Sequence, residues 1–318
     1  MIVKQKLTWL RMLFFFRWSS LDDTWPRIAV ITAVSIVVTW IELATGITAY
    51  SLTIAPFSLI GLALSIFLGF RNNAAYDRYW EGRILWGGMV NIARSFTRQV
   101  TTLIVAPQQR HDATAKSPKW LTEFRRDLVL RTIAYVHALR HHLRDSDPTP
   151  ELKDYLRDEE LSALADQKNV PLAVLQEQGQ RLQQAWREGW LHDYHMGLME
   201  ESLTEMTALQ GGMERIKNTP IPFAYTVLIH RIVACYCFAL PFGLVQTVGF
   251  LTPVVVLMIS YAFFGLDVIG DEIEDPFSTA PHDLPLTAIS LTIEVNLLQQ
   301  IGETNLPEIP VPQDDVLL

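Results

Sequence analysis

Four long apolar segments constrain this chain more than any other feature. They cover about residues 28–50, 54–70, 223–245 and 251–267, and the first is interrupted only by Glu42. A helix needs about 20 apolar residues to cross a bilayer core of roughly 30 Å, and the second segment lies at the short limit. Short turns join the segments in two pairs, and 49% of all residues are apolar. The sequence therefore predicts an all-α membrane protein with four transmembrane helices.

Lysine and arginine are distributed unevenly among the connections. Residues 46–56 and 249–253 contain neither, whereas the N-terminus and the segment after the second apolar stretch contain several: Lys4, Lys6, Arg11, Arg17, Arg71, Arg78, Arg83, Arg94 and Arg98. Because basic loops stay in the cytoplasm, we predict that both termini, residues 71–222 and residues 268–318 are cytoplasmic. The net charge of −8 disfavours a nucleic-acid partner.

Outside these segments the chain has the composition of polar helices. Residues 121–144 repeat apolar positions at helical spacing, and the following Asp-Pro-Thr-Pro sequence predicts a break. Residues 9–18 are basic and aromatic, which fits either a helix on the membrane surface or a buried amphipathic helix. Cys235 and Cys237 would point to different sides of a helix, so we interpret them as buried small apolar residues and not as a disulfide.

Motifs of common enzymes are absent from the sequence. It has no phosphate-binding glycine loop, no paired CxxC, no HExxH and no GxSxG. His192 and His195 are three residues apart and would share a helical face, which could bind a metal. A solvated polar stretch is the alternative, since no third ligand is in view. Arg231 lies within the third apolar segment, where we expect it to face protein or water.

A dense acidic segment ends the fourth apolar stretch. Residues 267–275 contain five carboxylates. Hard oxygen ligands at this density could hold a divalent cation, and the candidate ligands are Asp271, Glu272, Glu274 and Asp275. The ligand spacing of a calcium-binding EF-hand loop is absent. An acidic face that caps the last membrane helix is therefore the alternative interpretation.

The second apolar segment contains two stripes of different size at the same four-residue spacing. Each helical residue turns by about 100°, so a step of four drifts by only about 40° and stays on one face. Small residues, which allow another helix to approach closely, form one stripe: Gly61, Ser65 and Gly69. Bulky residues form the adjoining stripe: Leu62, Ile66 and Phe70. In a single chain the bulky stripe would fill a core or face lipid, whereas in a symmetric ring it would form an apolar constriction.

Short motifs occur in a fixed order along nearly the whole chain. They are residues 54–61 (IAPFSLIG), 67–72 (FLGFRN), 78–80 (RYW), 220–226 (PIPFAYT) and 272–277 (EIEDPF). In this order they resemble the bestrophins, a family of pentameric ion channels, and specifically the bacterial branch. The resemblance implies a single bestrophin-type domain over residues 1–318, a homopentamer around one central pore, and a location in the bacterial inner membrane.

The resemblance also implies roles for single residues. In the family, three hydrophobic rings of the second membrane helix form the neck of the pore, and they correspond to Leu62, Ile66 and Phe70. In the family, a single apolar residue that lies some distance upstream of the Pro-Ile-Pro segment forms a second constriction, the cytoplasmic aperture. Alignment without gaps places this residue at Tyr194, where the family usually has an aliphatic side chain. The implied channel is passive and requires no cofactor; its partners are further copies of the chain, the lipid bilayer and monovalent ions.

Departures from the animal bestrophins bear on selectivity and gating. Animal members have phenylalanine where Ile66 stands, and isoleucine lacks the partly positive ring edge that can meet an anion. Chloride selectivity is general among animal relatives, whereas bacterial relatives are associated with sodium-type cation permeation. The acidic segment matches the animal calcium clasp only in part. The alternative functions are a membrane-anchored scaffold that recruits a soluble partner, and a metal-dependent enzyme that uses His192 and His195.

Overall fold

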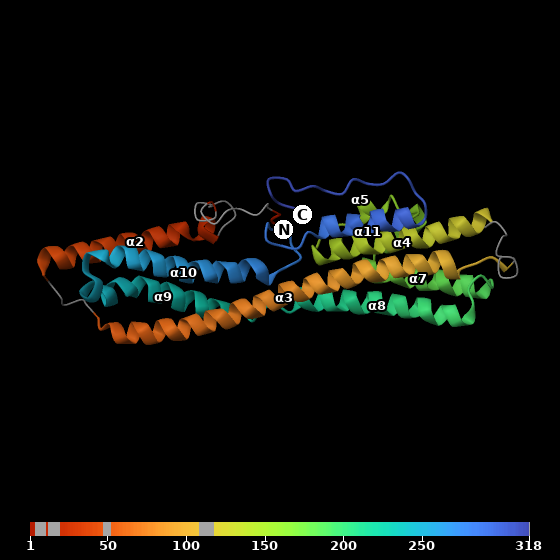
Figure 1. Ribbon diagram of the computed structural model, residues 1–318. Coiled ribbons are helices and arrows are strands. Elements are labelled where there is room, and N and C mark those ends of the chain that lie inside the picture. The colour runs from red at the N-terminus through yellow and green to blue at the C-terminus, as the bar shows by residue number, and fades with distance from the viewer. Residues whose placement is uncertain (4–10, 12–19, 47–51, 108–117, 318) are drawn as a thin grey trace. The chain divides into compact units, whose positions relative to one another are not determined.

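The computed structural model describes residues 1–3, 11, 20–46, 52–107 and 118–317, and within these ranges the fold is helical (Figure 1). Apart from helices, the described residues form only isolated β-bridges, such as that between Ile2 and Val316. The principal helices are α2 (Ser20–Thr45), α3 (Ile54–Leu103), α4 (Lys119–Leu143), α5 (Thr149–Leu152), α6 (Asp158–Leu164), α7 (Val170–Arg187), α8 (Asp193–Asn218), α9 (Phe223–Val248), α10 (Thr252–Glu274) and α11 (Leu286–Gln300).

The chain divides into two compact units. The membrane unit, as we call it, comprises Lys4–Trp80 and Pro220–Pro276, and it contains α2, the first half of α3, α9 and α10. The polar unit comprises Met1–Val3, Glu81–Thr219 and Phe277–Leu318. A single bestrophin-type domain over residues 1–318 stays a prediction, because a family domain can contain more than one compact unit.

The membrane unit is a bundle whose helices α2, α9 and α10 lie side by side (Figure 1). Its core contains branched and aromatic side chains from all four helices: Ile28, Ile31, Phe57, Leu64, Leu68, Ile229, Val233, Cys237, Leu240, Leu244, Val256 and Phe264. Many other large apolar side chains remain exposed on the outside of these helices, among them Trp40, Val30 and Met258. An apolar exterior around an apolar core is the arrangement expected of helices that face lipid.

The helices of the membrane unit correspond closely to the predicted apolar segments. Three helical stretches are long and apolar enough to cross a membrane: Ser20–Thr45, Ile54–Leu103 and Phe223–Glu274. The third stretch contains both α9 and α10, which a short 3-10 turn at Gly249–Leu251 separates. Gly249 has a φ of +61°, a conformation that is readily available only to glycine. α2 covers Ser20–Thr45 and so includes polar residues, among them Asp22 and Asp23, ahead of the apolar segment that begins near residue 28.

Two sequence predictions fall on residues outside the described ranges. The end of the first apolar segment, residues 47–50, lies there, as does most of the basic and aromatic stretch at residues 9–18. The cysteine interpretation is confirmed in part: the two cysteines form no disulfide and Cys237 is buried, but the prediction that Cys235 is buried was wrong, because its side chain is exposed on α9.

The polar unit is built around α4, which packs against α7, α8 and α11 (Figure 1). α4 spans Lys119–Leu143, so the helix predicted at residues 121–144 is confirmed. From Leu128 to Arg140 nearly every side chain is buried, including Arg131, His137 and Arg140. A helix that is buried all round must satisfy its polar groups inside the protein, and the partners of these three residues are described below.

Candidate functional site

The bulky stripe of α3 is exposed in the single chain. The exposed fractions are 63% for Leu62, 50% for Ile66 and 64% for Phe70. The same turns of α3 bury Leu64 and Leu68 in the core of the membrane unit. Three large apolar side chains on one open helix face must therefore be covered by lipid, by further copies of the chain or by a poorly hydrated passage.

The small stripe behaves differently at its two ends. Gly61 is buried, and a Cβ at this position would lie 2.5 Å from the hydroxyl of Tyr236 on α9. Ser65 and Gly69 are exposed, and a Cβ on Gly69 would meet nothing within 4 Å. Among the three residues of the small stripe, close helix packing within one chain is thus found only at Gly61. The cause is the drift of about 40° per step of four, which rotates the later small residues out of the contact.

A buried charge network lies directly after the bulky stripe. The guanidinium of Arg71 has no exposed surface, and its Nη1 donates to Asp267 Oδ1 over 2.9 Å. Its Nη2 donates to Asp271, and His230 contacts Asp267 through Nδ1 and Asp271 through Nε2. The network therefore ties the helix that carries Phe70 to α9 and α10.

His230 was not predicted to belong to this network. The neighbouring Arg231 was singled out instead, and it is exposed and makes no contact to Glu42 or to any other acidic group among the described residues. A charged or polar residue within an apolar segment was the available signal, and it applied equally to His230.

The acidic segment is engaged by groups of the same unit. Asp271 pairs with Arg71 and His230, and Glu274 accepts a hydrogen bond of 3.0 Å from the backbone N–H of Ile221. Within the described ranges, no group of three or more His, Cys, Asp or Glu side chains is arranged to hold a metal ion. A divalent cation at Asp271, Glu272, Glu274 and Asp275 stays a prediction, and it would have to compete with the Arg71 guanidinium.

His192, Tyr194 and His195 lie together at the start of α8. His192 precedes the helix, and its Nδ1 accepts a hydrogen bond of 3.3 Å from the backbone N–H of Tyr194. The ring centroids of the two histidines are 5.8 Å apart. Tyr194 stacks on His192 and has an exposed fraction of 84%, so its ring is free to face other subunits or solvent. Its role as the cytoplasmic aperture stays a prediction.

Comparison with known protein families identifies the family of this chain. The model of the bacterial and fungal bestrophin proteins matches residues 1–299 of the chain. The chain belongs to the bestrophin family. The resemblance inferred from the short motifs is thereby confirmed, and the chain's relatives are ion channels rather than enzymes.

Curated relatives match this bestrophin over nearly its whole length. A protein of Ralstonia nicotianae named a voltage-dependent anion channel-forming protein is 40% identical, with 96% of each chain covered. A protein of the same name from Escherichia coli K12 is 38% identical, again with 96% of each chain covered. A solved bacterial bestrophin homologue from Klebsiella pneumoniae is 37% identical with a TM-score of 0.77, and the match covers 87% of this chain and 98% of that one.

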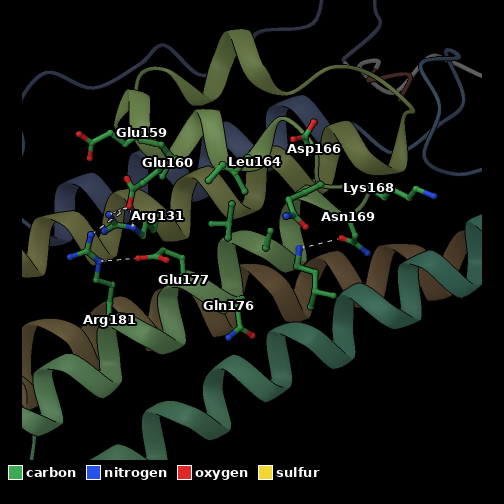
Figure 2. Close-up of a pocket in the computed structure, with 16 residues that line it drawn as sticks. Arg131, Glu159, Glu160, Leu164, Asp166, Lys168, Asn169, Gln176, Glu177 and Arg181 are labelled. Carbon is green, nitrogen blue, oxygen red and sulfur yellow. Dashed lines mark hydrogen bonds and ion pairs between the residues drawn. The ribbon is translucent and has the colours of Figure 1, made fainter.

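The polar unit of this bestrophin contains a cavity of about 780 Å³ beside α6 and α7 (Figure 2). Leu164 and Leu172 contribute apolar surface to its wall. Arg131 donates to Glu160 from Nε over 3.0 Å, and Arg181 Nη2 lies 3.6 Å from the same carboxylate. Both arginines of the cavity are thus compensated by protein carboxylates, and they offer no uncompensated charge to a ligand.

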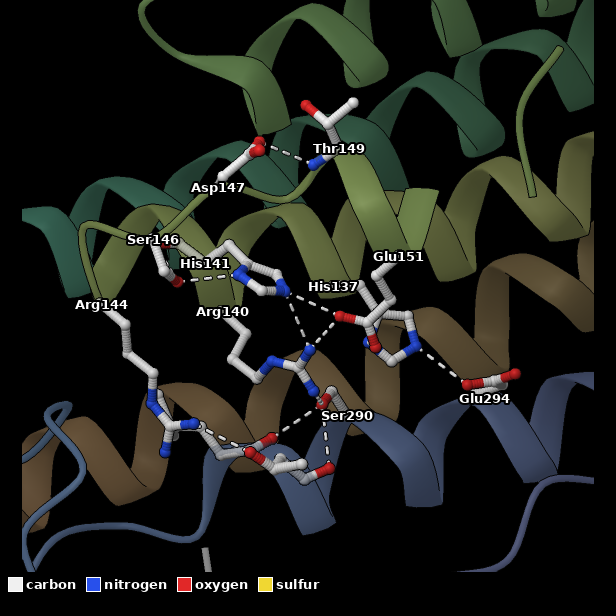
Figure 3. Close-up of polar contacts among 12 residues, drawn as sticks. His137, Arg140, His141, Arg144, Ser146, Asp147, Thr149, Glu151, Ser290 and Glu294 are labelled. Atoms are coloured by element: carbon white, nitrogen blue, oxygen red, sulfur yellow. Dashed lines mark hydrogen bonds and ion pairs between the residues drawn. The ribbon is translucent and has the colours of Figure 1, made fainter. Parts of the chain in front are cut away.

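A second polar network crosses the polar unit from α4 to α5 and α11 (Figure 3). His137, which has no exposed surface, places Nδ1 at 3.0 Å from Glu151 and Nε2 at 2.9 Å from Glu294. Arg140 pairs with Glu151 and donates to Ser290 Oγ over 3.0 Å. A buried carboxylate, Glu294, and a partly exposed one, Glu151, therefore share the cations of α4.

The protonation of His137 and Glu151 is coupled through their contact. Burial alone lowers the pKa of His137, but its interactions with Glu151 and Glu294 outweigh burial and raise that pKa. Burial raises the pKa of Glu151, whereas His137, His141 and Arg140 outweigh it and hold that pKa well below its usual range. Both ring nitrogens of His137 face carboxylates, so the imidazolium form fits the site best.

Proposed function

We propose that this chain forms a passive ion channel of the bestrophin type, in which the bulky stripe of α3 lines a dry neck. The observation that carries the proposal is the exposure of Leu62, Ile66 and Phe70 on one face of a helix whose other face is buried. Membership of an ion-channel family supports the conducting function, and it explains why an apolar face can be left open in a single chain.

The proposal includes a homopentamer in the bacterial inner membrane. Around a symmetry axis each of the three side chains would repeat once per subunit, so the neck would consist of three stacked apolar rings. An apolar constriction of this kind gates by dewetting, because hydrated ions cannot enter it until it widens. The cytoplasmic aperture at Tyr194 and cytoplasmic locations for both termini belong to the same proposal.

Arg71 has a positioning role in this proposal. It follows Phe70 directly and is fixed by Asp267 and Asp271 of α10, so a movement of α10 would shift the last ring of the neck. No cofactor and no energy source is needed. Monovalent ions would pass down their electrochemical gradient.

The side chains of the neck do not determine whether the permeating ion is an anion or a cation, so a measurement is needed. Isoleucine and leucine side chains exclude by size and dryness, which discriminate poorly by sign. The relatives' names specify anions for those proteins. A reversal potential measured in asymmetric salt, which moves toward the equilibrium potential of chloride or of sodium, assigns the sign for this chain.

Bilayer recording of the purified full-length protein tests the neck. In Ile66→Ala the constriction widens and hydrates more readily, so we expect at least a tenfold rise in current, which corresponds to a barrier lowered by about 1.4 kcal/mol. Phe67→Ala is the matched control, since Phe67 is also exposed but lies about 100° around the helix. Equal currents from the wild type and Ile66→Ala would remove Ile66 from the pathway, and a monomer in detergent would remove the shared axis.

A further inference from the structure

An apolar groove lies on the membrane unit between α9 and the first turns of α3. Its volume is about 680 Å³, which lies within the range of roughly 300–1,000 Å³ typical of sites for small organic ligands. Phe57 and Ile60 line it from α3, and Tyr236 and Ala239 line it from α9. Among the described residues that line the groove, Arg231 alone is charged.

Close contacts between the two helices fix the walls of this groove. A Cβ on Gly61 would lie 2.5 Å from the Tyr236 hydroxyl, and a Cβ on Gly243 would lie 2.5 Å from the ring of Phe57. The Phe57 and Tyr236 ring centroids are 6.3 Å apart. Because each aromatic side chain is held against the backbone at a glycine, the groove is present without any ligand.

Arg231 lacks a protein partner within the described ranges. Its side chain is exposed, and no hydrogen bond or ion pair joins it to another described residue. It lies on a helix that is long and apolar enough to cross a membrane, about 12 Å from the first residue, Phe223. Helical Cα–Cβ bonds tilt toward the N-terminus, so a long side chain here reaches most easily toward the membrane interface nearest Phe223.

The charge at this place selects the kind of occupant. A guanidinium within a membrane helix is costly unless an anion accompanies it, and a lipid phosphate is the anion found at the interface. The planar fork of arginine matches phosphate oxygens with two parallel hydrogen bonds. Most of the other residues that line the groove are apolar, which suits a hydrocarbon chain attached to that phosphate.

We propose that this groove binds an anionic membrane phospholipid, with the lipid phosphate on Arg231 and an acyl chain against Phe57, Ile60 and Tyr236. The same surface could otherwise face a carboxylate of a second subunit, and the experiment below separates that case. A lipid in the groove would fill the space between α9 and α3, and α3 is the helix that carries the bulky stripe.

Native mass spectrometry of the full-length protein in detergent, titrated with dioleoylphosphatidylglycerol or dioleoylphosphatidylcholine, tests the head-group contact. We expect the anionic lipid to bind at least fivefold more tightly, and Arg231→Gln to reduce this preference below twofold. Arg231→Lys should keep part of it, because the charge remains without the planar fork. Arg27→Gln is the matched control, since Arg27 is an exposed arginine of the same unit outside the groove, and it should keep the full preference.

A second variant tests the acyl-chain contact independently of charge. Ala239→Trp fills the groove, and we expect it to weaken binding of both lipids at least fivefold without changing the oligomer size. Equal binding of the two lipids by the wild type, or a preference that survives in Arg231→Gln, would overturn the proposal. Dissociation of the oligomer in Arg231→Gln would assign the arginine to a subunit contact. Full competition by inorganic phosphate with no effect of Ala239→Trp would reduce the site to a simple anion site.

Discussion

Replacement of His137 by glutamine probes the polar network of α4 directly. In the wild type both imidazole nitrogens face carboxylates, Glu151 at 3.0 Å and Glu294 at 2.9 Å, and the ring has no exposed surface. His137→Gln keeps a side chain of similar length but removes the positive charge. The buried carboxylate of Glu294 and the partly exposed carboxylate of Glu151 then have one cation fewer.

The expected loss of stability follows from the partners that remain. Removal of one member of a buried ion pair costs about 3–5 kcal/mol. Glu151 keeps Arg140 and His141, and Glu294 keeps a hydrogen bond of 2.8 Å from Tyr155. We therefore expect the lower end, about 3 kcal/mol, which corresponds to a fall in melting temperature of about 6–12 °C.

The pH dependence of this loss has a definite sign. The pKa of folded His137 is raised, so its contribution is complete below the unfolded value of about 6.5 and disappears as the pH rises through the folded value. The pKa of folded Glu151 is lowered, so its contribution is complete above about 4.3 and disappears as the pH falls. The stabilisation by the pair is therefore largest between about pH 5 and 6.5.

Thermal unfolding of the detergent-solubilised protein between pH 5 and 9 measures both effects. The difference between wild type and His137→Gln should be largest near pH 6 and should shrink at alkaline pH. His142→Gln is the matched control, because His142 lies on the same helix but is partly exposed and pairs with Glu214; we expect a loss below about 1 kcal/mol. A His137→Gln protein as stable as this control at pH 6, or with the wild-type pH profile, would refute the reasoning.

Further substitutions test the packing and the charges of the membrane unit. Arg71→Gln leaves the buried carboxylate of Asp267 without its arginine, so we expect about 3–5 kcal/mol lower stability and a lower melting temperature; an unchanged melting temperature would contradict the buried pairing. Gly243→Ala places a Cβ 2.5 Å from the Phe57 ring and should cost about 1–3 kcal/mol in chemical unfolding, whereas Gly211→Ala, where the Cβ meets nothing within 4 Å, should be neutral or slightly stabilising.

The membrane helices could be predicted from the sequence because their signal is local. Length and apolarity place the beginnings of α3, α9 and α10 correctly, although α3 continues to Leu103, well past the end of its apolar segment near residue 70. The spacing of Leu62, Ile66 and Phe70 places these residues on one exposed face. α2 also includes polar residues ahead of the apolar segment that begins near residue 28, because apolarity marks the bilayer core and not the full length of a helix. Helix ends depend on capping and charge as well as on apolarity.

The polar networks could not be predicted because their members are distant in sequence. Glu294 lies 157 positions from His137, and the two meet only after α11 packs against α4. Nothing local distinguishes His137 from the neighbouring His141 and His142, which are less buried. The sequence also did not determine which face of α3 contacts α9. Residues at a constant spacing of four drift around a helix, whereas a contact between two helices alternates steps of three and four residues.

The pairing of Arg71 also sets an order of events during synthesis. Its principal partner, Asp267, lies 196 positions later in the chain. At a translation rate of about 5–20 residues per second, roughly 10–40 s pass before that carboxylate leaves the ribosome. Throughout this interval α3 holds an arginine at the edge of its apolar segment without its permanent counter-charge. The nascent chain must therefore keep Arg71 at the water-facing boundary of the insertion machinery, and the arginine can become buried only when α10 arrives.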